Sequence, residues 1–93
     1  MSNYKITEYS FKKAKKLNLV IKVSINPSKK IDVYKDNVYL ASIGDSQYMD
    51  YPNYIRIYGQ IYANERKRLY VNRHTINANI IYSKQWLSLN LLW

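Results

Sequence analysis

The chain has 93 residues, no cysteine, one histidine and a net charge of +9, from 15 Lys and Arg against 6 Asp and Glu. The lack of cysteine excludes disulfide bonds and thiolate metal sites, and one histidine cannot form a histidine-based metal site by itself. The length predicts a single domain, residues 1–93, and the charge favours polyanionic partners, nucleic acid first. Abundant lysine beside Tyr, Ile and Asn also fits translation of an A/T-rich genome, which would raise the charge without any functional demand.

Membrane insertion and secretion are not expected from the sequence. No apolar run approaches the roughly 20 residues needed to span a bilayer. No apolar segment of a secretory signal follows Met1. We therefore expect an intracellular protein, or one carried inside a particle.

A short lysine-rich helix is predicted near the N-terminus, after a loose terminus over residues 1–6. Ser10 is the candidate N-cap, and Phe11, Ala14 and Leu17 recur at spacing three as the apolar face. The other face carries Lys12, Lys13, Lys15 and Lys16. This lysine face is either a solvated helix surface or a patch that contacts phosphate groups.

Residues 19–43 are predicted to form three strands of an antiparallel sheet, because apolar and polar residues alternate there. The strands are expected at 19–25, 30–34 and 38–43. Asn-Pro-Ser at 26–28 is a turn signal, and Asp36 and Asn37 tolerate the positive φ of a tight hairpin. The expected inward side chains are Ile21, Val23, Ile25, Ile31 and Val33, and the expected outward ones include Asp32 and Tyr34.

The segment 48–74 holds all four arginines, the only histidine and six of the eleven tyrosines. Asp50 followed by Pro52 is a helix start signal, and residues 52–73 are predicted to be mostly helical. Tyrosines recur at every fourth position from 54 to 62, which is one stripe of a helix. Gly59 interrupts this stripe at a cost of about 1 kcal/mol relative to Ala, so a bend or a break can occur there.

Beyond Gly59, rings and guanidinium groups share one helical face. The residues of this face are Tyr62, Arg66, Tyr70 and Arg73, and Ile61, Ala63 and Leu69 are left to make core contacts. Such a face suits nucleic acid, because rings stack on bases and arginine grips phosphate at two points. The other interpretation is that the tyrosines cover the edge of a small core and the arginines are solvated.

The C-terminal part is the most apolar region of the chain. Residues 75–79 are predicted to be a loop, and Ser83 is expected to cap a last helix over residues 84–92. Trp86, Leu89 and Trp93 recur there at spacings of three and four. They either close the core over the sheet or form an exposed docking patch for another chain.

The sequence carries no motif of a known catalytic site. It has no nucleophile elbow, no phosphate-binding P-loop and no dinucleotide-binding glycine pattern. Asp45 and Asp50 are a weak signal for a shared cation, and Asp50 has the simpler role of a charge at a helix start. His74 is placed favourably against the C-terminal dipole of the preceding helix. We therefore predict a protein that is not an enzyme, with no catalytic residue, metal site or cofactor.

Short motifs follow one another from residue 29 to the C-terminus. They are Lys30-Ile31-Asp32-Val33-Tyr34, Ser42-Ile43-Gly44, Tyr48-Met49-Asp50-Tyr51-Pro52-Asn53-Tyr54-Ile55, Tyr62-Ala63-Asn64-Glu65-Arg66, Leu69-Tyr70, Arg73-His74 and Leu91-Leu92-Trp93. In order and spacing, the Ser-Ile-Gly, Asp-Tyr and Arg-His elements resemble a group of small basic proteins encoded by large DNA viruses and some phages. The resemblance implies a viral setting, at a replication site in the host or inside the virion, rather than a particular activity.

The predicted fold is α+β, with a three-stranded antiparallel sheet packed by a long or kinked helix and a C-terminal helix. The predicted function is non-enzymatic binding of nucleic acid, with DNA as the favoured partner. The predicted binding residues are Arg66, Arg73, Tyr62, Tyr70, Lys12, Lys13, Lys15 and Lys16. The alternative is a structural or minor virion protein that binds other virion proteins, or further copies of itself, through Trp86, Leu89 and Trp93.

Overall fold

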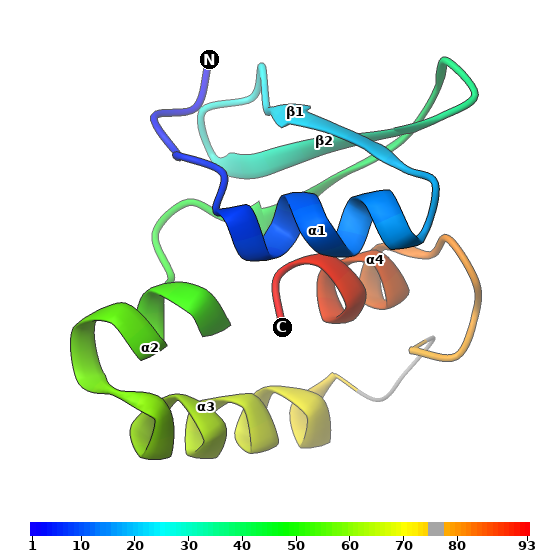
Figure 1. The fold of residues 1–93 in the computed structure, drawn as a ribbon. Helices are drawn as coiled ribbons and strands as arrows, with labels where there is room; N and C mark the ends of the chain where they lie inside the picture. The colour runs from blue at the N-terminus through cyan, green and yellow to red at the C-terminus, as the bar shows by residue number, and fades with distance from the viewer. Residues whose placement is uncertain (75–77) are drawn as a thin grey trace. The chain divides into compact units, whose positions relative to one another are not determined.

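The computed structural model describes residues 1–74 and 78–93, which form one three-stranded antiparallel sheet and four helices (Figure 1). The predicted α+β fold class is therefore confirmed. The backbone contacts divide the chain into two compact units, residues 1–48 and residues 49–93. We call them the N-terminal unit and the C-terminal unit and describe each by itself. The first three residues of the predicted loop, 75–77, lie outside the described residues.

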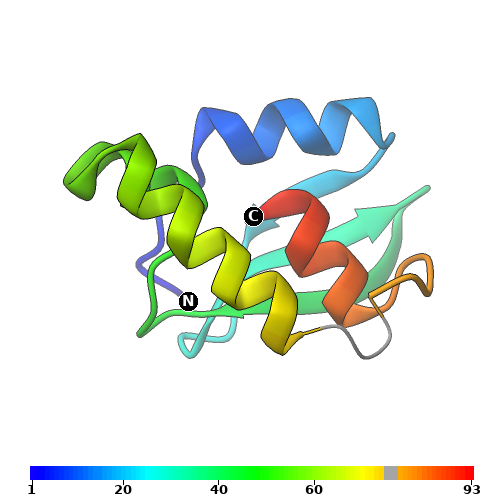
Figure 2. The same ribbon diagram turned by 90° about the horizontal axis from the view of Figure 1, so that it is seen from below.

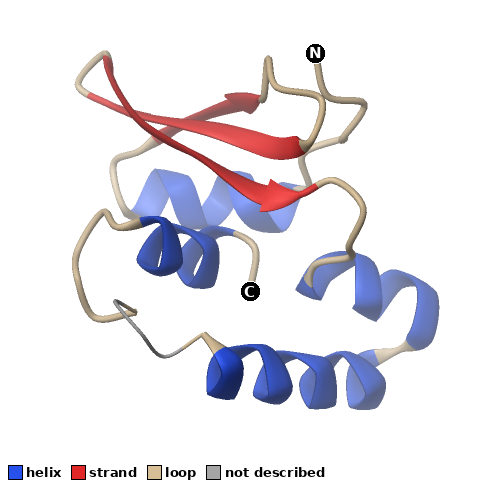
Figure 3. Ribbon diagram, turned by 180° about the vertical axis from the view of Figure 1, so that it is seen from behind, coloured by secondary structure: helices blue, strands red, loops and turns tan. Residues whose placement is uncertain are grey.

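The N-terminal unit consists of one helix and the sheet. Its elements are α1 (Glu8–Lys16), β1 (Val20–Val23), β2 (Lys29–Lys35) and β3 (Val38–Asp45). The strands are antiparallel neighbours in the order β1-β2-β3 (Figure 3). Asp36 and Asn37 form the β2–β3 turn with φ values of 50° and 66°, as their tolerance of positive φ predicts.

The core of the N-terminal unit contains the apolar side chains of one sheet face, along which α1 lies (Figure 1). The buried apolar residues of this unit are Ala14, Leu19, Ile21, Ile31, Val33, Ala41 and Ile43. The strand residues among them alternate with residues of the other face, because successive side chains of a strand point to opposite sides. The predicted inward positions 21, 31 and 33 are confirmed.

The start of α1 differs from the prediction. The N-cap is Thr7, whose side-chain oxygen accepts a hydrogen bond from the Ser10 N–H at 3.2 Å. Ser10 is itself fully buried, whereas Phe11 is 49% exposed. The buried face of α1 is therefore centred on Ser10 and Ala14, and Phe11 lies at its edge.

The N-terminal residues are held to the sheet, which contradicts the expectation of a loose terminus. The Ser2 N–H donates to the carbonyl of Ser24 at 2.8 Å, and Ser2 is buried. The ring of Tyr4 lies 5.2 Å from the ammonium nitrogen of Lys30, which is also buried. Two of the sheet residues that face away from the core, Lys30 and Asp32, are thus buried too.

One strand prediction was wrong near the β1–β2 connection. β1 ends at Val23, and Ile25 is 76% exposed instead of pointing inward. Asp32 faces away from the core, as predicted, and is nevertheless buried. One of its carboxylate oxygens accepts the Ile25 N–H at 3.1 Å, just beyond the end of β1.

The C-terminal unit is helical. Its elements are α2 (Tyr51–Tyr58), α3 (Gln60–Arg73) and α4 (Lys84–Leu91). Asp50 caps α2 through a hydrogen bond from the Asn53 N–H, and Pro52 lies in the first turn, as predicted. Ser83 caps α4 by accepting the Trp86 N–H at 3.2 Å, which confirms a second predicted cap. In two views α4 runs back antiparallel to α3 (Figures 1 and 2).

A glycine separates α2 from α3. Gly59 has φ 91° and ψ 170°, which lies in a region that only glycine adopts without strain. The predicted helix over residues 52–73 is therefore confirmed, with a full break where the sequence allowed a bend or a break. Tyr54 and Tyr58 of α2 still contact the Tyr62 ring of α3 across this break. Ala63 is fully buried, but Ile61 is 89% exposed, so the prediction of Ile61 as a core residue was wrong.

None of the helices in the described part of the chain is both long and apolar enough to cross a membrane.

Candidate nucleic-acid interface

The predicted face of rings and arginines is a continuous stripe of α3, but much of it points into the C-terminal unit. Tyr62 is 45% exposed and Arg73 is exposed, so both can be reached from solvent. Arg66 and Tyr70 are half-buried. The stripe therefore splits into two accessible residues and two residues that pack against neighbouring rings.

Tyr70 has a ring on each side. His74 stacks on it with a centroid distance of 4.1 Å, and Trp93 stacks on it at 4.3 Å. Two rings at these separations must occupy opposite faces, because they would overlap on the same face. Burial raises the pKa of the Tyr70 hydroxyl above its ordinary value, and a hydrogen bond with Ser88 opposes that rise. The expectation that Tyr70 stacks on a base does not fit this geometry, since no face of its ring is free.

Arg66 belongs to an aromatic cluster at the α2–α3 corner. Its guanidinium carbon lies 5.7 Å from the ring centroid of Tyr54. The rings of Tyr54, Tyr58 and Tyr62 lie 4.7–6.2 Å apart, and Tyr54 also contacts Trp93 at 6.0 Å. Pairs at such distances add about 0.5–1.5 kcal/mol each beyond their buried area. In this position Arg66 covers a ring of the cluster.

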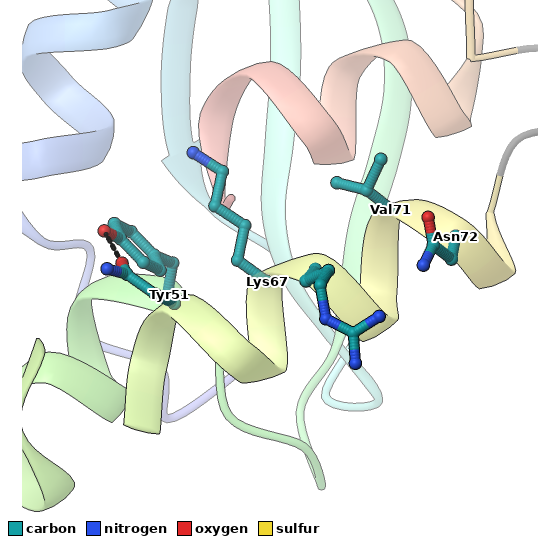
Figure 4. A pocket seen from close by; sticks show the side chains of 6 residues that line it. Tyr51, Lys67, Val71 and Asn72 are labelled. Carbon is teal, nitrogen blue, oxygen red and sulfur yellow. Dashed lines mark hydrogen bonds between the residues drawn. The ribbon is translucent and has the colours of Figure 1, made fainter. Parts of the chain in front are cut away.

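Another face of α3 carries a different set of polar groups. A hollow of about 350 Å³ is lined by Tyr51, Asn64, Lys67, Arg68, Val71 and Asn72 (Figure 4). The Tyr51 hydroxyl donates to the Asn64 side-chain oxygen at 2.8 Å, and the Lys67 ammonium lies 4.9 Å from the Tyr51 ring. The hollow thus combines two cations with amide and hydroxyl groups, which are the groups that bind phosphate oxygens.

Arg68 is engaged by a carboxylate on its own helix. Its Nη2 and Nε donate to the two carboxylate oxygens of Glu65 at 2.5 and 3.2 Å. These hydrogen bonds hold the pKa of Glu65 below its ordinary value. Both side chains are more than half exposed, so water screens the pair and a phosphate oxygen can compete for the same guanidinium.

The chain matches no protein-family model, no curated protein and no solved structure.

The lysine face of α1 lies in the N-terminal unit. Lys12, Lys15 and Lys16 are exposed, and Lys12 forms an ion pair with Glu8 at 3.3 Å. Lys13 differs from them, because its ammonium donates to the Tyr9 hydroxyl at 3.2 Å and lies 4.9 Å from that ring. Three of the four predicted lysines therefore project into solvent together.

The predicted docking residues of α4 are covered to different degrees. Trp93 is only 7% exposed and lies in the ring stack with Tyr70. Trp86 and Leu89 are half-buried, and Trp86 meets the Tyr82 ring edge-on at 5.5 Å. Trp93 thus has no surface to offer a partner. The prediction that these residues close the core over the sheet stays a prediction.

Each candidate acidic residue has a local structural role. Asp50 is fully buried at the α2 cap, and Asp45 accepts the Gln47 N–H at 2.9 Å in the turn after β3. His74 is the C-cap of α3, as its place near the helix dipole suggested. Among the described residues no group of three or more His, Cys, Asp or Glu side chains could hold a metal ion.

The sequence contains a helical pattern for the α3 hollow that is separate from the predicted stripe of rings and arginines. Asn64, Arg68 and Asn72 recur at spacings of four, and Lys67 and Val71 stand one position before the last two. This is the same spacing that places residues on one helical face. The contribution of Tyr51 has no such signal, because it comes from a different helix.

Proposed function

We propose that this chain is a non-enzymatic nucleic-acid-binding protein, with DNA in a viral setting as its partner. The α3 hollow carries the proposal, because Lys67 and Arg68 stand there beside the amides of Asn64 and Asn72. The C-terminal unit has six Lys and Arg side chains against two carboxylates. One of these carboxylates is buried at the α2 cap and the other already shares Arg68, so the surface keeps a positive field.

The exposed lysines of α1 are proposed as further phosphate contacts. Lys12, Lys15 and Lys16 extend from one helix, and flexible ammonium groups neutralise phosphates without requiring a particular base sequence. Arg73 and Tyr62 remain candidate contacts from the predicted face. The viral setting rests on the resemblance of the sequence motifs alone.

The first test measures affinity for labelled duplex and single-stranded DNA by fluorescence anisotropy from about 50 to about 200 mM salt. Each neutralised phosphate releases condensed counterions, so the affinity of the wild-type protein should fall steeply with salt. A protein that binds neither form of DNA, or whose affinity does not change with salt concentration, would contradict the proposed function.

The second test asks whether the hollow, together with the exposed Arg73 in the last turn of α3, is the site. The triple variant Lys67→Gln, Arg68→Gln, Arg73→Gln should lower the salt slope by about three units, roughly one per phosphate contact. The matched control Lys5→Gln, Lys29→Gln, Lys84→Gln removes the same charge from three separated positions and should keep the wild-type slope. Equal slopes in the two triple variants would show that the charge acts only as a diffuse field.

The Glu65–Arg68 pair offers a sharper test of the same site. A phosphate at Arg68 must displace the Glu65 carboxylate or share the Arg68 guanidinium with it. Glu65→Gln should therefore raise the DNA affinity. A rise of roughly threefold is the scale of one unit charge several ångströms away in water. Asp45→Asn removes the same charge from an exposed position at the end of β3, keeps an oxygen that can accept the Gln47 N–H, and is the control. In an Arg68→Gln background the effect of Glu65→Gln should shrink, and an undiminished effect would count against direct competition.

A second candidate function, protein docking in a virion, is favoured by a surface other than the predicted one. Ile57, Tyr58 and Ile61 are 52%, 57% and 89% exposed around Gly59. Exposed apolar side chains that lie together are typical of protein contacts. If this corner assembles copies of the chain, Ile57→Asn with Ile61→Asn should convert an oligomer into a monomer in a sedimentation measurement. A wild-type protein that is monomeric at all concentrations would remove self-assembly from this alternative.

A further inference from the structure

The sheet has a solvent-facing aromatic patch at the end near the β2–β3 turn. Tyr34 on β2 pairs with Val20 on β1 and with Tyr39 on β3. The Tyr34 and Tyr39 rings meet edge to face with centroids 5.8 Å apart. The Lys22 ammonium lies 5.3 Å from the Tyr34 ring centroid, so it shares this side of the sheet. We call Lys22, Tyr34 and Tyr39 the sheet patch.

The sheet patch is open to solvent, unlike the rest of that face. Tyr39 is 53% exposed, and Val20 beside the patch is also 53% exposed. Further along the same face, Lys30 and Asp32 are buried. An aromatic side chain that is half exposed on a strand contributes little to core packing, but a ligand in solvent can contact it.

A chain of hydrogen bonds orients the Tyr39 ring. The Ser42 hydroxyl donates to the Asp32 carboxylate at 2.5 Å, and the Tyr39 hydroxyl lies 2.7 Å from the Ser42 oxygen. Since Ser42 has one hydroxyl hydrogen and gives it to Asp32, Tyr39 must be the donor to Ser42. A buried anion therefore holds an exposed ring in one orientation, which lowers the entropy lost when that ring binds a partner.

We propose that the sheet patch stacks on an unpaired base, with Tyr39 as the platform, and that Lys22 contacts the adjoining phosphate. This inference rests on the proposed function and adds that single strands bind where duplexes do not. Aromatic side chains on an open sheet can reach the face of an unpaired base, whereas the bases of a duplex cover one another's faces. The Tyr34 ring meets the Tyr39 ring in an edge-to-face contact. The positive charge of Lys22 attracts the phosphate backbone of the single-stranded nucleic acid and keeps it near the Tyr39 ring.

The test compares two tyrosines of matched exposure. Tyr39→Leu removes the platform, and Tyr58→Leu removes a ring that is 57% exposed in the C-terminal unit. Affinities are measured for a labelled single-stranded oligothymidylate and for a duplex of the same length. Tyr39→Leu should weaken single-strand binding by roughly fivefold to a hundredfold, the range found for stacked aromatic residues, and should leave duplex binding unchanged. Tyr58→Leu should change neither affinity.

Further variants keep the test decisive if Tyr39→Leu fails to fold. Tyr39→Trp presents a larger ring and should tighten single-strand binding, while Tyr39→Phe keeps the ring and should lose less affinity than leucine. If the wild-type protein binds DNA but none of these changes alters its single-strand affinity, the sheet patch is not a binding site and the proposed function stands. If the wild-type protein binds no nucleic acid, the proposed function and this inference both fail.

Discussion

At the scale of single residues, the buried carboxylate of Asp32 connects the three strands. One of its oxygens accepts the Ile25 N–H that follows β1, and the other accepts the Ser42 hydroxyl of β3. Burial alone would raise the pKa of Asp32, but hydrogen bonds from Ser42, Ser24 and the Ile25 N–H outweigh it and hold the pKa below its ordinary value. The ionised form of Asp32 is therefore the one that stabilises the sheet.

A first prediction follows for the dependence of stability on pH. The unfolded chain takes up a proton at Asp32 near the ordinary value of about 4, before the folded chain does. The contribution of Asp32 to the free energy of unfolding is thus complete above that pH and is lost as the pH falls through the lower folded pKa. Asp32→Asn should lower the free energy of unfolding at neutral pH by about 1–3 kcal/mol. It should also make the decrease of this free energy at acidic pH less steep. Denaturant titrations from neutral to acidic pH would show this.

The control for Asp32 is Asp36→Asn in the exposed β2–β3 turn. Asparagine tolerates the positive φ of that position, so the change should leave both the stability and its decrease at acidic pH close to wild type. If stability falls equally steeply at acidic pH in the wild-type protein and in Asp32→Asn, other carboxylates cause the loss of stability.

A second prediction at this scale concerns Tyr70. Its ring lies between His74 and Trp93, so Tyr70→Ala should lower the free energy of unfolding by about 2–3 kcal/mol, somewhat below the range for fully buried aromatic residues. Tyr70→Phe keeps the stack and loses only the hydrogen bond with Ser88, at about 1 kcal/mol. Chemical unfolding measures both changes. A Tyr70→Ala protein with wild-type stability and weakened DNA binding would restore the stacking role predicted from the sequence.

At the scale of elements, Gly59 decides that the helical segment is two helices. A β-carbon added at Gly59 would meet no atom within 4 Å, so any penalty of a substitution comes from the backbone angles alone. Within α3, Ile61 is exposed while Ala63 is buried, because residues two apart in a helix point to nearly opposite sides.

We therefore expect Gly59→Ala to destabilise the protein by about 1–3 kcal/mol in thermal unfolding, because an L-residue is strained at these angles. D-alanine at position 59 in a chemically synthesised chain adopts positive φ readily, so it should be tolerated and should also reduce the entropy of the unfolded chain. A Gly59→Ala protein with unchanged stability and more helix by circular dichroism would indicate that α2 and α3 can fuse into one helix.

At the scale of the whole molecule, positive charge greatly exceeds negative charge. The net charge of +9 is spread so that the residues of the N-terminal unit supply nine lysines and no arginine, while those of the C-terminal unit supply all four arginines. The Glu8–Lys12 and Glu65–Arg68 pairs are both exposed and contribute little. Repulsion among like charges should therefore weaken the folded state at low ionic strength.

A prediction for the whole chain is that its melting temperature rises with salt. Screening shortens the range of repulsion from roughly 30 Å at 0.01 M to roughly 10 Å at 0.1 M salt, so differential scanning fluorimetry should show an upward shift over that interval. DNA affinity should fall over the same interval, because salt competes for the phosphate contacts. A melting temperature that falls with salt would mean that attractive ion pairs outweigh the repulsion.

The sequence by itself determined the features that depend on neighbouring residues. The alternation of apolar residues predicted the strands, the Asp36-Asn37 pair predicted the tight turn, and Asp50 and Ser83 predicted two helix starts. Each of these signals works within a few residues, because caps, turns and strand periods are satisfied locally. The helical spacing of Asn64, Arg68 and Asn72 is equally local, so that part of the α3 hollow could have been predicted as well.

Only the tertiary structure decided which side of each element is accessible. Tyr70 meets Trp93, Asp32 meets Ser42, and Tyr51 meets Asn64, and the members of each pair are ten or more positions apart in the sequence. Such contacts leave no periodic trace, since a ring or carboxylate is covered by groups whose positions depend on how distant segments pack. The predicted binding stripe of α3 is therefore partly buried, whereas Tyr58 beside Gly59 and Tyr39 on the sheet patch are more than half exposed.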